Sequence, residues 1–189
     1  LEKFLTNFNY YKYEKKISRK KINNKRYKLI GLKNIGKIRT AILNDDRRRY
    51  KDFAKYFRNK TILDFGCGVG DFLYLVRNKV KKCFGVEINQ KCIARIKKKK
   101  KIIVSDNIND FDEKFDLITM FHVLEHIPYQ IKILKSLKKK LKKNGKILIE
   151  VPSAHDFLLT FKKLKEFRDF TFWSEHLLLH TKRSLKTVL

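Results

Sequence analysis

The segment GCGVG at residues 66–70 places a glycine at every second position, directly after a short apolar run that contains Asp64. Because glycine has no Cβ atom, such a loop can turn sharply and lie against a ligand at the start of the next helix. The spacing is neither the G-x-G-x-x-G of a dinucleotide site nor a phosphate loop with its Gly-Lys-Ser/Thr. Asp64 can accept hydrogen bonds from the loop amides and face a cationic ligand. We therefore expect a ligand-binding turn here.

Two further acidic residues follow the next apolar runs, Glu87 after the second run and Asp106 after the third. A carboxylate at the position of Glu87 can accept hydrogen bonds from both hydroxyls of a ribose. Asp106 is placed to meet an adenine amino group. A solvated carboxylate at a strand end is the alternative for each. Together with the glycine loop, these residues predict a site for a nucleoside-containing cofactor.

A third polar group, in the segment HVLEH at residues 122–126, has the H-x-x-E-H spacing that can place metal ligands on one face of a helix. The segment follows a fourth apolar run inside the pattern of a cofactor-binding fold. For that reason we do not expect a metalloprotease site.

Short apolar runs alternate with amphipathic stretches from residue 60 onward. The runs predicted as strands are Thr61–Phe65, Cys83–Ile88, Ile102–Val104, Phe115–Phe121 and Lys146–Val151, and the stretches predicted as helices are 71–79, 89–100 and 129–143. Strands that are apolar on both faces and separated by helices predict an α/β fold, with a mostly parallel sheet covered by helices on both faces. Ligands in such folds lie beyond the carboxyl ends of the strands, where the polar residues above stand.

The first part of the chain differs from the rest. Residues 1–44 carry aromatic side chains and lysines without a sustained period, and we expect an N-terminal extension with no assigned structure. An Asn-Asp-Asp cap at 44–46 predicts a helix that leads into the main domain, residues 45–189.

Composition limits the classes of partner. A formal net charge of +28 is typical of proteins that bind nucleic acid or anionic membranes. However, the excess is mainly lysine spread along the chain, whereas phosphate and base recognition depend more on arginine. No apolar run approaches the roughly 18 residues of a membrane span. The three cysteines match no zinc spacing, which indicates free thiols and a cytoplasmic protein.

In their order along the chain, these motifs resemble those of class I S-adenosylmethionine-dependent methyltransferases. The resemblance is carried by residues 64–70, Glu87, Asp106, residues 115–127 and residues 141–149. It is strongest to the branch that acts on small molecules, including ubiquinone-pathway O-methyltransferases and methyltransferases of sugar and surface-polysaccharide biosynthesis. It implies a Rossmann-like fold and S-adenosylmethionine as the cofactor.

The resemblance also implies roles for single residues. Phe121 and His122 would line the methionine end of the cofactor. His176 would lie near the substrate, where a neutral imidazole can take a proton from an acceptor hydroxyl, and we expect His176 and His122 to be catalytic; a structural role is the alternative for His176. No metal is expected, because the Val-Leu-Glu-His segment is common in methyltransferases that bind none. The residues expected to bind the cofactor are Asp64, Gly66, Cys67, Gly68, Gly70, Glu87, Ile88, Asp106, Asn107 and Phe121.

Two features depart from the family pattern. Residues 143–145 are Lys-Asn-Gly where the family usually has Pro-Gly-Gly, and Asn144 is expected to tolerate the left-handed turn. The family continues with a final antiparallel strand pair after a helix like the one predicted near Lys182. Since this sequence stops at Leu189, we expect that pair to be missing.

Methyl transfer from a sulfonium mainly requires that the acceptor, the methyl group and the sulfur be aligned. We expect a small-molecule substrate that is methylated on a hydroxyl or an activated carbon. One alternative is an RNA methyltransferase whose lysines at 97–101 and 138–143 grip phosphates. The other is a non-catalytic cofactor-binding module.

Overall fold

The computed structural model describes residues 45–160, 171–172 and 176–189, so the predicted extension at residues 1–44 lies outside the described residues. The helix expected after residue 44 is confirmed at residues 45–52, and a short helix, α5 (Ala54–Phe57), follows it. No helix in the described ranges is long and apolar enough to cross a membrane.

Within the described residues, a sheet of five parallel strands forms the centre, in the order β3-β2-β1-β4-β5. The strands are β1 (Thr61–Phe65), β2 (Lys82–Val86), β3 (Ile103–Ser105), β4 (Phe115–Phe121) and β5 (Leu141–Glu150). The chain steps outward from β1 to β3 and then returns to the other side of β1. This reversal between β1 and β4 is the place where ligands bind in open parallel sheets. The predicted α/β fold is confirmed.

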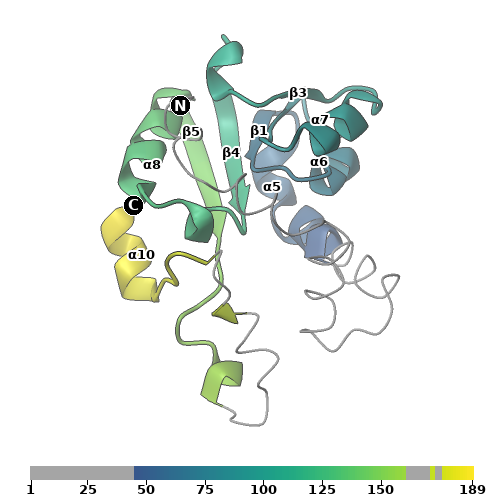
Figure 1. Cartoon of the computed structure of the whole chain (residues 1–189). Helices are drawn as coiled ribbons and strands as arrows, with labels where there is room; N and C mark the ends of the chain where they lie inside the picture. The colour runs from purple at the N-terminus through teal and green to yellow at the C-terminus, as the bar shows by residue number, and fades with distance from the viewer. Residues whose placement is uncertain (1–44, 161–170, 173–175) are drawn as a thin grey trace, which may run out of the picture.

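Helices cover both faces of the sheet (Figure 1). The helices are α6 (Asp71–Val76), α7 (Gln90–Lys97), α8 (Gln130–Lys139) and α10 (Lys182–Val188), and the 3-10 turns are η1 (Ile108–Asp110), η2 (Leu124–His126) and η3 (Phe157–Thr160). α5, α6 and α7 pack on one face, and α8 and α10 pack on the other. Neighbouring residues of β1 point to opposite faces of the sheet. Ile62 packs on the face covered by α5, α6 and α7, and Leu63 packs on the face covered by α8 and α10. Both side chains are fully buried, as the apolar runs predict.

The predicted helix at 129–143 is wrong at its end. α8 stops at Lys139, and β5 begins at Leu141, which pairs with Phe115. The register then shifts, so that Lys146 pairs with Leu117. The lysines at 142 and 143 fit the predicted helix, but backbone pairing with β4 makes this segment a strand.

The left-handed turn expected at Asn144 is also wrong, because neither Asn144 nor Gly145 has a positive φ. Gly145 is required for a different reason. A Cβ atom there would lie 2.7 Å from the carbonyl oxygen of Phe115, closer than side chains approach. The glycine therefore lets β5 lie close to β4 at the shift in register.

Candidate functional site

The glycine loop joins β1 to α6, and its three glycines all adopt the left-handed φ that favours glycine. They differ in their surroundings. A Cβ atom on Gly66 would lie 2.4 Å from Val123 Cγ2, and one on Gly70 would lie 2.9 Å from Ile96 Cγ1. A Cβ atom on Gly68 would meet nothing within 4 Å. Gly66 and Gly70 therefore allow close packing, while Gly68 faces space that a ligand could fill.

Glu87 lies beside this space, directly after β2. Its Oε2 accepts a hydrogen bond from Gly68 N at 2.8 Å, and its Oε1 accepts one from Asn89 N at 2.9 Å. The backbone of Glu87 is held as well, because its N–H donates to the carbonyl of Ser105 at 3.0 Å. A carboxylate has about four lone-pair sites, so each oxygen can accept one further hydrogen bond. Glu87 can thus anchor the loop and accept two ligand hydroxyls at once.

Asp64 does not accept hydrogen bonds from the loop amides, which corrects that part of the prediction. The N–H groups of Gly66 and Cys67 donate instead to the carbonyl of Val86, at 2.8 and 3.0 Å. Asp64 is 4% exposed, and its Oδ1 accepts a hydrogen bond from Thr119 Oγ1 at 2.7 Å. Burial raises the pKa of Asp64 to about 7 although the bond from Thr119 lowers it. Asp64 thus lies buried beneath the loop.

Cys67 contributes to the core as well as to the loop. Its side chain is 9% exposed, and a Cβ atom on Gly85 would lie 2.7 Å from its sulfur. Burial raises the pKa of the Cys67 thiol, so it is not a reactive thiolate. Ile88, directly after Glu87, is half-buried. Cys67 and Ile88 were both expected to bind the cofactor, and the side chain of Cys67 lies in the protein interior.

Asp106 and Asn107 follow β3, next to the end of β2. The exposed carboxylate of Asp106 accepts a hydrogen bond from Gln90 Nε2 at 2.7 Å. The side-chain oxygen of Asn107 caps η1 by accepting from Asn109 N at 2.9 Å. The structure places Asp106 and Glu87 at adjacent strand ends, as predicted, because Val86 pairs with Ser105. Asp106 would have to share its carboxylate between Gln90 and an adenine.

A buried ion pair that sequence reasoning missed joins the helix at 45–52 to the end of β5. Arg49 is 7% exposed, and its guanidinium donates to Glu150 Oε1 at 2.6 and 3.0 Å and to Asp46 Oδ1 at 2.9 Å. Its guanidinium carbon lies 4.6 Å from the centroid of the Phe121 ring. The spacing of Asp46 and Arg49, three apart on a predicted helix, is the signal that could have indicated an ion pair.

Phe121, expected at the methionine end of the cofactor, is half-buried in an aromatic cluster at the end of β4. Its ring stacks on Phe53 at 6.2 Å and meets Phe72 edge-on at 5.0 Å. These contacts hold one side of the Phe121 ring against Phe53 and Phe72.

His122 lies between two carboxylates directly after β4. Its Nε2 is 3.3 Å from Glu150 Oε1, and its Nδ1 is 3.4 Å from Glu125 Oε1. Glu125 and Glu150 raise the pKa of His122 to about 9, so at neutral pH it carries a proton and cannot accept another. Burial raises the pKa of Glu150, but hydrogen bonds from His122, Arg49 and Arg48 outweigh burial and hold that pKa well below its usual range. His122 in this arrangement serves as a cation rather than a base.

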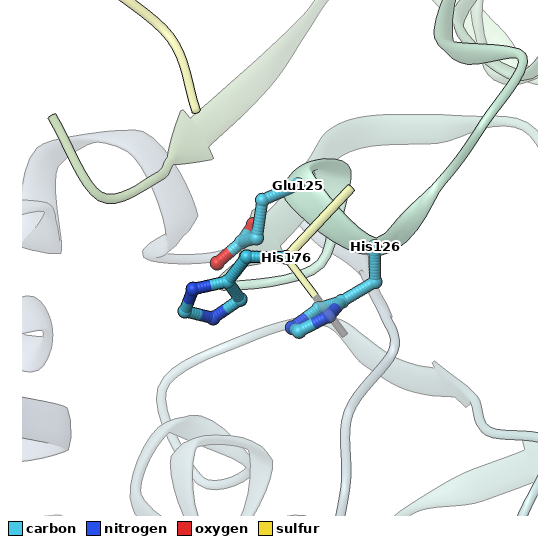
Figure 2. A group of neighbouring side chains, drawn as sticks. All are labelled: Glu125, His126 and His176. Carbon is cyan, nitrogen blue, oxygen red and sulfur yellow. The ribbon is translucent and has the colours of Figure 1, made fainter. Parts of the chain in front are cut away.

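The H-x-x-E-H segment does not form a helix face. His122 has a left-handed φ of 54°, and only Leu124–His126 form the 3-10 turn η2. His176 nevertheless lies against this turn, with its ring centroid 5.0 Å from that of His126 (Figure 2). Its Nδ1 is 2.8 Å from the carbonyl oxygen of Thr171. The structure thus brings both expected catalytic histidines, His122 and His176, to the surroundings of Glu125.

With this geometry established, comparison with known proteins identifies the family. A family model described as a methyltransferase domain matches residues 39–189. This chain belongs to the methyltransferase-domain family. The glycine loop, Glu87 and the parallel sheet all lie inside the matched region of this methyltransferase domain.

Curated relatives match part of their own length. An uncharacterized protein of Methanocaldococcus jannaschii is 31% identical over 61% of this chain and 52% of its own length. The mitochondrial ubiquinone biosynthesis O-methyltransferase of Candida albicans is 26% identical over 72% of this chain and 43% of its own. The ubiquinone biosynthesis O-methyltransferase of Histophilus somni is 30% identical over 54% and 50%. The methyltransferase-domain chain thus spans about half the length of these relatives.

Solved structures share the fold. The plantazolicin methyltransferase BpumL, in complex with a monoazolic desmethylPZN analog and SAH, has a TM-score of 0.62 at 17% identity, over 93% of this chain and 69% of its own. A SAM-dependent methyltransferase from Archaeoglobus fulgidus has a TM-score of 0.60 at 25% identity, over 77% of this chain and 66% of its own.

Proposed function

We propose that the protein is an S-adenosylmethionine-dependent methyltransferase. The observation that carries the proposal is the hydrogen bond from Gly68 N to Glu87 Oε2 beside the space that Gly68 faces. A nucleoside in that space would give its two ribose hydroxyls to the remaining lone pairs of Glu87. The family match and the names of the relatives, two of them O-methyltransferases, support the same cofactor.

The proposed substrate is a small molecule with a hydroxyl or an activated carbon as acceptor. The relatives named for ubiquinone biosynthesis support this class. The lysines at 138–143 do not favour RNA, because they lie around the start of the edge strand β5, whereas Glu87 follows the carboxyl end of β2 on the other side of β1 and β4. One of them, Lys142, is already paired with Asp116 at 2.7 Å.

The chemistry asked of the protein is mainly alignment. S-adenosylmethionine supplies a methyl group activated by its positive sulfur, and the acceptor must approach opposite that sulfur. Glu87 and the loop at 66–70 would hold the nucleoside, while Phe121 would border the reacting end. His176 is the proposed base for the acceptor hydroxyl, since His122 is held as a cation.

Calorimetric titration with S-adenosylmethionine tests the proposal. The Glu87→Ala variant should bind at least tenfold more weakly than the wild type, a loss of about 1.4 kcal/mol. Glu113→Ala is the matched control, because Glu113 precedes β4 and pairs with Lys82 at the other end of β2. Equal affinity of the wild type and Glu87→Ala would remove the ribose role, and no binding to the wild type would remove the cofactor.

A further inference from the structure

A hollow of about 400 Å³ lies at the amino ends of β1, β4 and β5, whereas the glycine loop and Glu87 follow the carboxyl ends of β1 and β2. Lysine makes up 36 of the 189 residues of the chain, but five of the nine described residues that line this hollow. We propose that the hollow binds a small ligand that carries a chain of phosphate groups, such as a triphosphate. The lysines that line it are Lys55, Lys60, Lys142, Lys143 and Lys146.

The irregular pairing of β5 with β4 forms one wall of the hollow. Between two paired positions, β5 has residues 142–145 and β4 has only Asp116. Such extra residues bend a strand and redirect its side chains. Lys142, Lys143 and Asn144 from this bulge all line the hollow, so it brings two ammonium groups and a side-chain amide to one place. Lys143 and Asn144 are also the positions at which the sequence departs from the family pattern.

One carboxylate faces these lysines in the described lining, that of Asp116. Its Oδ2 accepts hydrogen bonds from Lys142 Nζ at 2.7 Å and from Thr61 N at 2.8 Å. Burial raises the pKa of Asp116, but these bonds and the positive charges of Lys142 and Lys60 outweigh burial and hold that pKa below its ordinary value. Asp116 is therefore ionised at neutral pH, and it balances one of the five positive charges of the hollow.

The positive charge that remains is the main argument for an anionic ligand. Among the described residues, the pair between Lys142 and Asp116 is the one ion pair that these lysines form. Lys55 has an aromatic neighbour instead, with its Nζ 5.1 Å from the centroid of the Tyr56 ring. Ammonium groups repel one another, and a concave surface lined by one sign of charge concentrates its potential. A bound polyanion would offset this repulsion.

The size of the hollow and its residue types favour a small phosphate ligand over a nucleic acid. A volume of about 400 Å³ lies within the range of roughly 300–1,000 Å³ that is typical of small-molecule sites. The lysine ammonium group binds phosphate as a compact charge with three donors, and lysines from α5, β5 and the residue before β1 can contact successive phosphates. Nucleic-acid recognition depends more on arginine, and none of the nine described residues in the lining is an arginine.

Calorimetric titration of the full chain with tripolyphosphate, at low salt and without cofactor, tests the proposal. The wild type should bind one tripolyphosphate per chain, roughly tenfold more tightly than orthophosphate, and added salt should weaken the binding. The double variant Lys143→Gln, Lys146→Gln should bind tripolyphosphate roughly tenfold more weakly than the wild type. The matched control is Lys97→Gln, Lys98→Gln, which removes the same charge from exposed lysines at the end of α7, outside the hollow, and should bind like the wild type.

Asp116→Asn should change the affinity in the opposite direction. The substitution removes the negative charge from the lining and keeps an oxygen that can accept from Thr61 N. Tripolyphosphate should therefore bind more tightly than to the wild type, a gain that a folding defect cannot produce. Circular dichroism checks that the lysine variants are folded. The affinity of all these variants for S-adenosylmethionine should stay unchanged, because the hollow and Glu87 lie at opposite ends of the strands.

Three results would overturn the proposal. The first is a wild type that does not bind tripolyphosphate. The second is an equal loss of affinity in the two double lysine variants, which would show an effect of net charge alone. The third is a single-stranded RNA that displaces tripolyphosphate and binds more tightly than it does, which would make the hollow part of a nucleic-acid surface.

Discussion

The carboxylate of Glu87 accepts a hydrogen bond from the backbone of Gly68, at 2.8 Å, and so joins the end of β2 to the loop after β1. One oxygen holds the loop and the other holds the N–H of Asn89, which caps α7. The same carboxylate keeps lone pairs for a ligand. This contact links the conformation of the loop to the ligand site. It involves Gly68, whereas Gly66 and Gly70 pack against Val123 and Ile96.

Gly68→Ala and Gly66→Ala should therefore fail in different ways. Both place a side chain at a left-handed φ, which costs about 1–2 kcal/mol of unfolding free energy. Gly66→Ala adds a clash with Val123, so its loss of stability should be the larger of the two. Gly68→Ala adds a methyl group in the space assigned to the nucleoside, and affinity should fall at least tenfold. Urea unfolding and calorimetry measure the two effects, and equal stability losses would contradict the assignment.

Asp64 should make stability fall as pH rises. Its pKa in the folded protein, about 7, lies above the ordinary value of 3.8. The folded state therefore holds the proton more tightly, so the contribution of Asp64 is fully present below pH 4 and is lost as pH rises to about 7. In Asp64→Asn this dependence should disappear. The measurement is the difference in unfolding free energy between the wild type and this variant, from pH 5 to pH 8. The pH-dependent contributions of the other titratable groups cancel in this difference. A difference that does not change with pH would contradict the burial of an ionisable Asp64.

Glu150 should contribute stability in the opposite direction. Its pKa is lowered in the fold, so the stabilisation is present above the ordinary value of 4.5 and is lost as pH falls below it. Glu150→Gln leaves the buried Arg49 with Asp46 as its remaining carboxylate partner, and should cost roughly 2–4 kcal/mol at pH 7.

The control for Glu150 is Asp45→Asn. Asp45 is exposed and its oxygen lies 3.7 Å from Arg48, so its loss should cost less than about 0.5 kcal/mol. Chemical unfolding at pH 7 compares the two variants. A Glu150→Gln variant that is as stable as the wild type would show that the pair does not hold the helix at 45–52 to β5.

The parts of the fold that depend on local pattern could be predicted from the sequence. β1 and β4 have the predicted bounds, because their runs are apolar on both faces and end at glycine or charged residues. The start of β5 could not be predicted. Its lysines continue the pattern of α8, and only pairing with Phe115 makes residues 141–145 extended.

The site shows the same limit. Glu87 and Gly68 could be placed together, because parallel strands bring their carboxyl ends to one edge. The partner of Asp64 could not, since the hydroxyl of Thr119 comes from a strand distant in sequence. Nor could the sequence show that His176 returns to Glu125 and His126, because that contact depends on how the chain after β5 folds back.

A crystal structure of the full chain with S-adenosylhomocysteine tests the central claim most directly. Both ribose hydroxyls should donate to the Glu87 carboxylate, with the nucleoside in the space that Gly68 faces and the sulfur toward the end of β4. A ligand bound elsewhere, or a Glu87 carboxylate without contact to the ribose, would contradict the account.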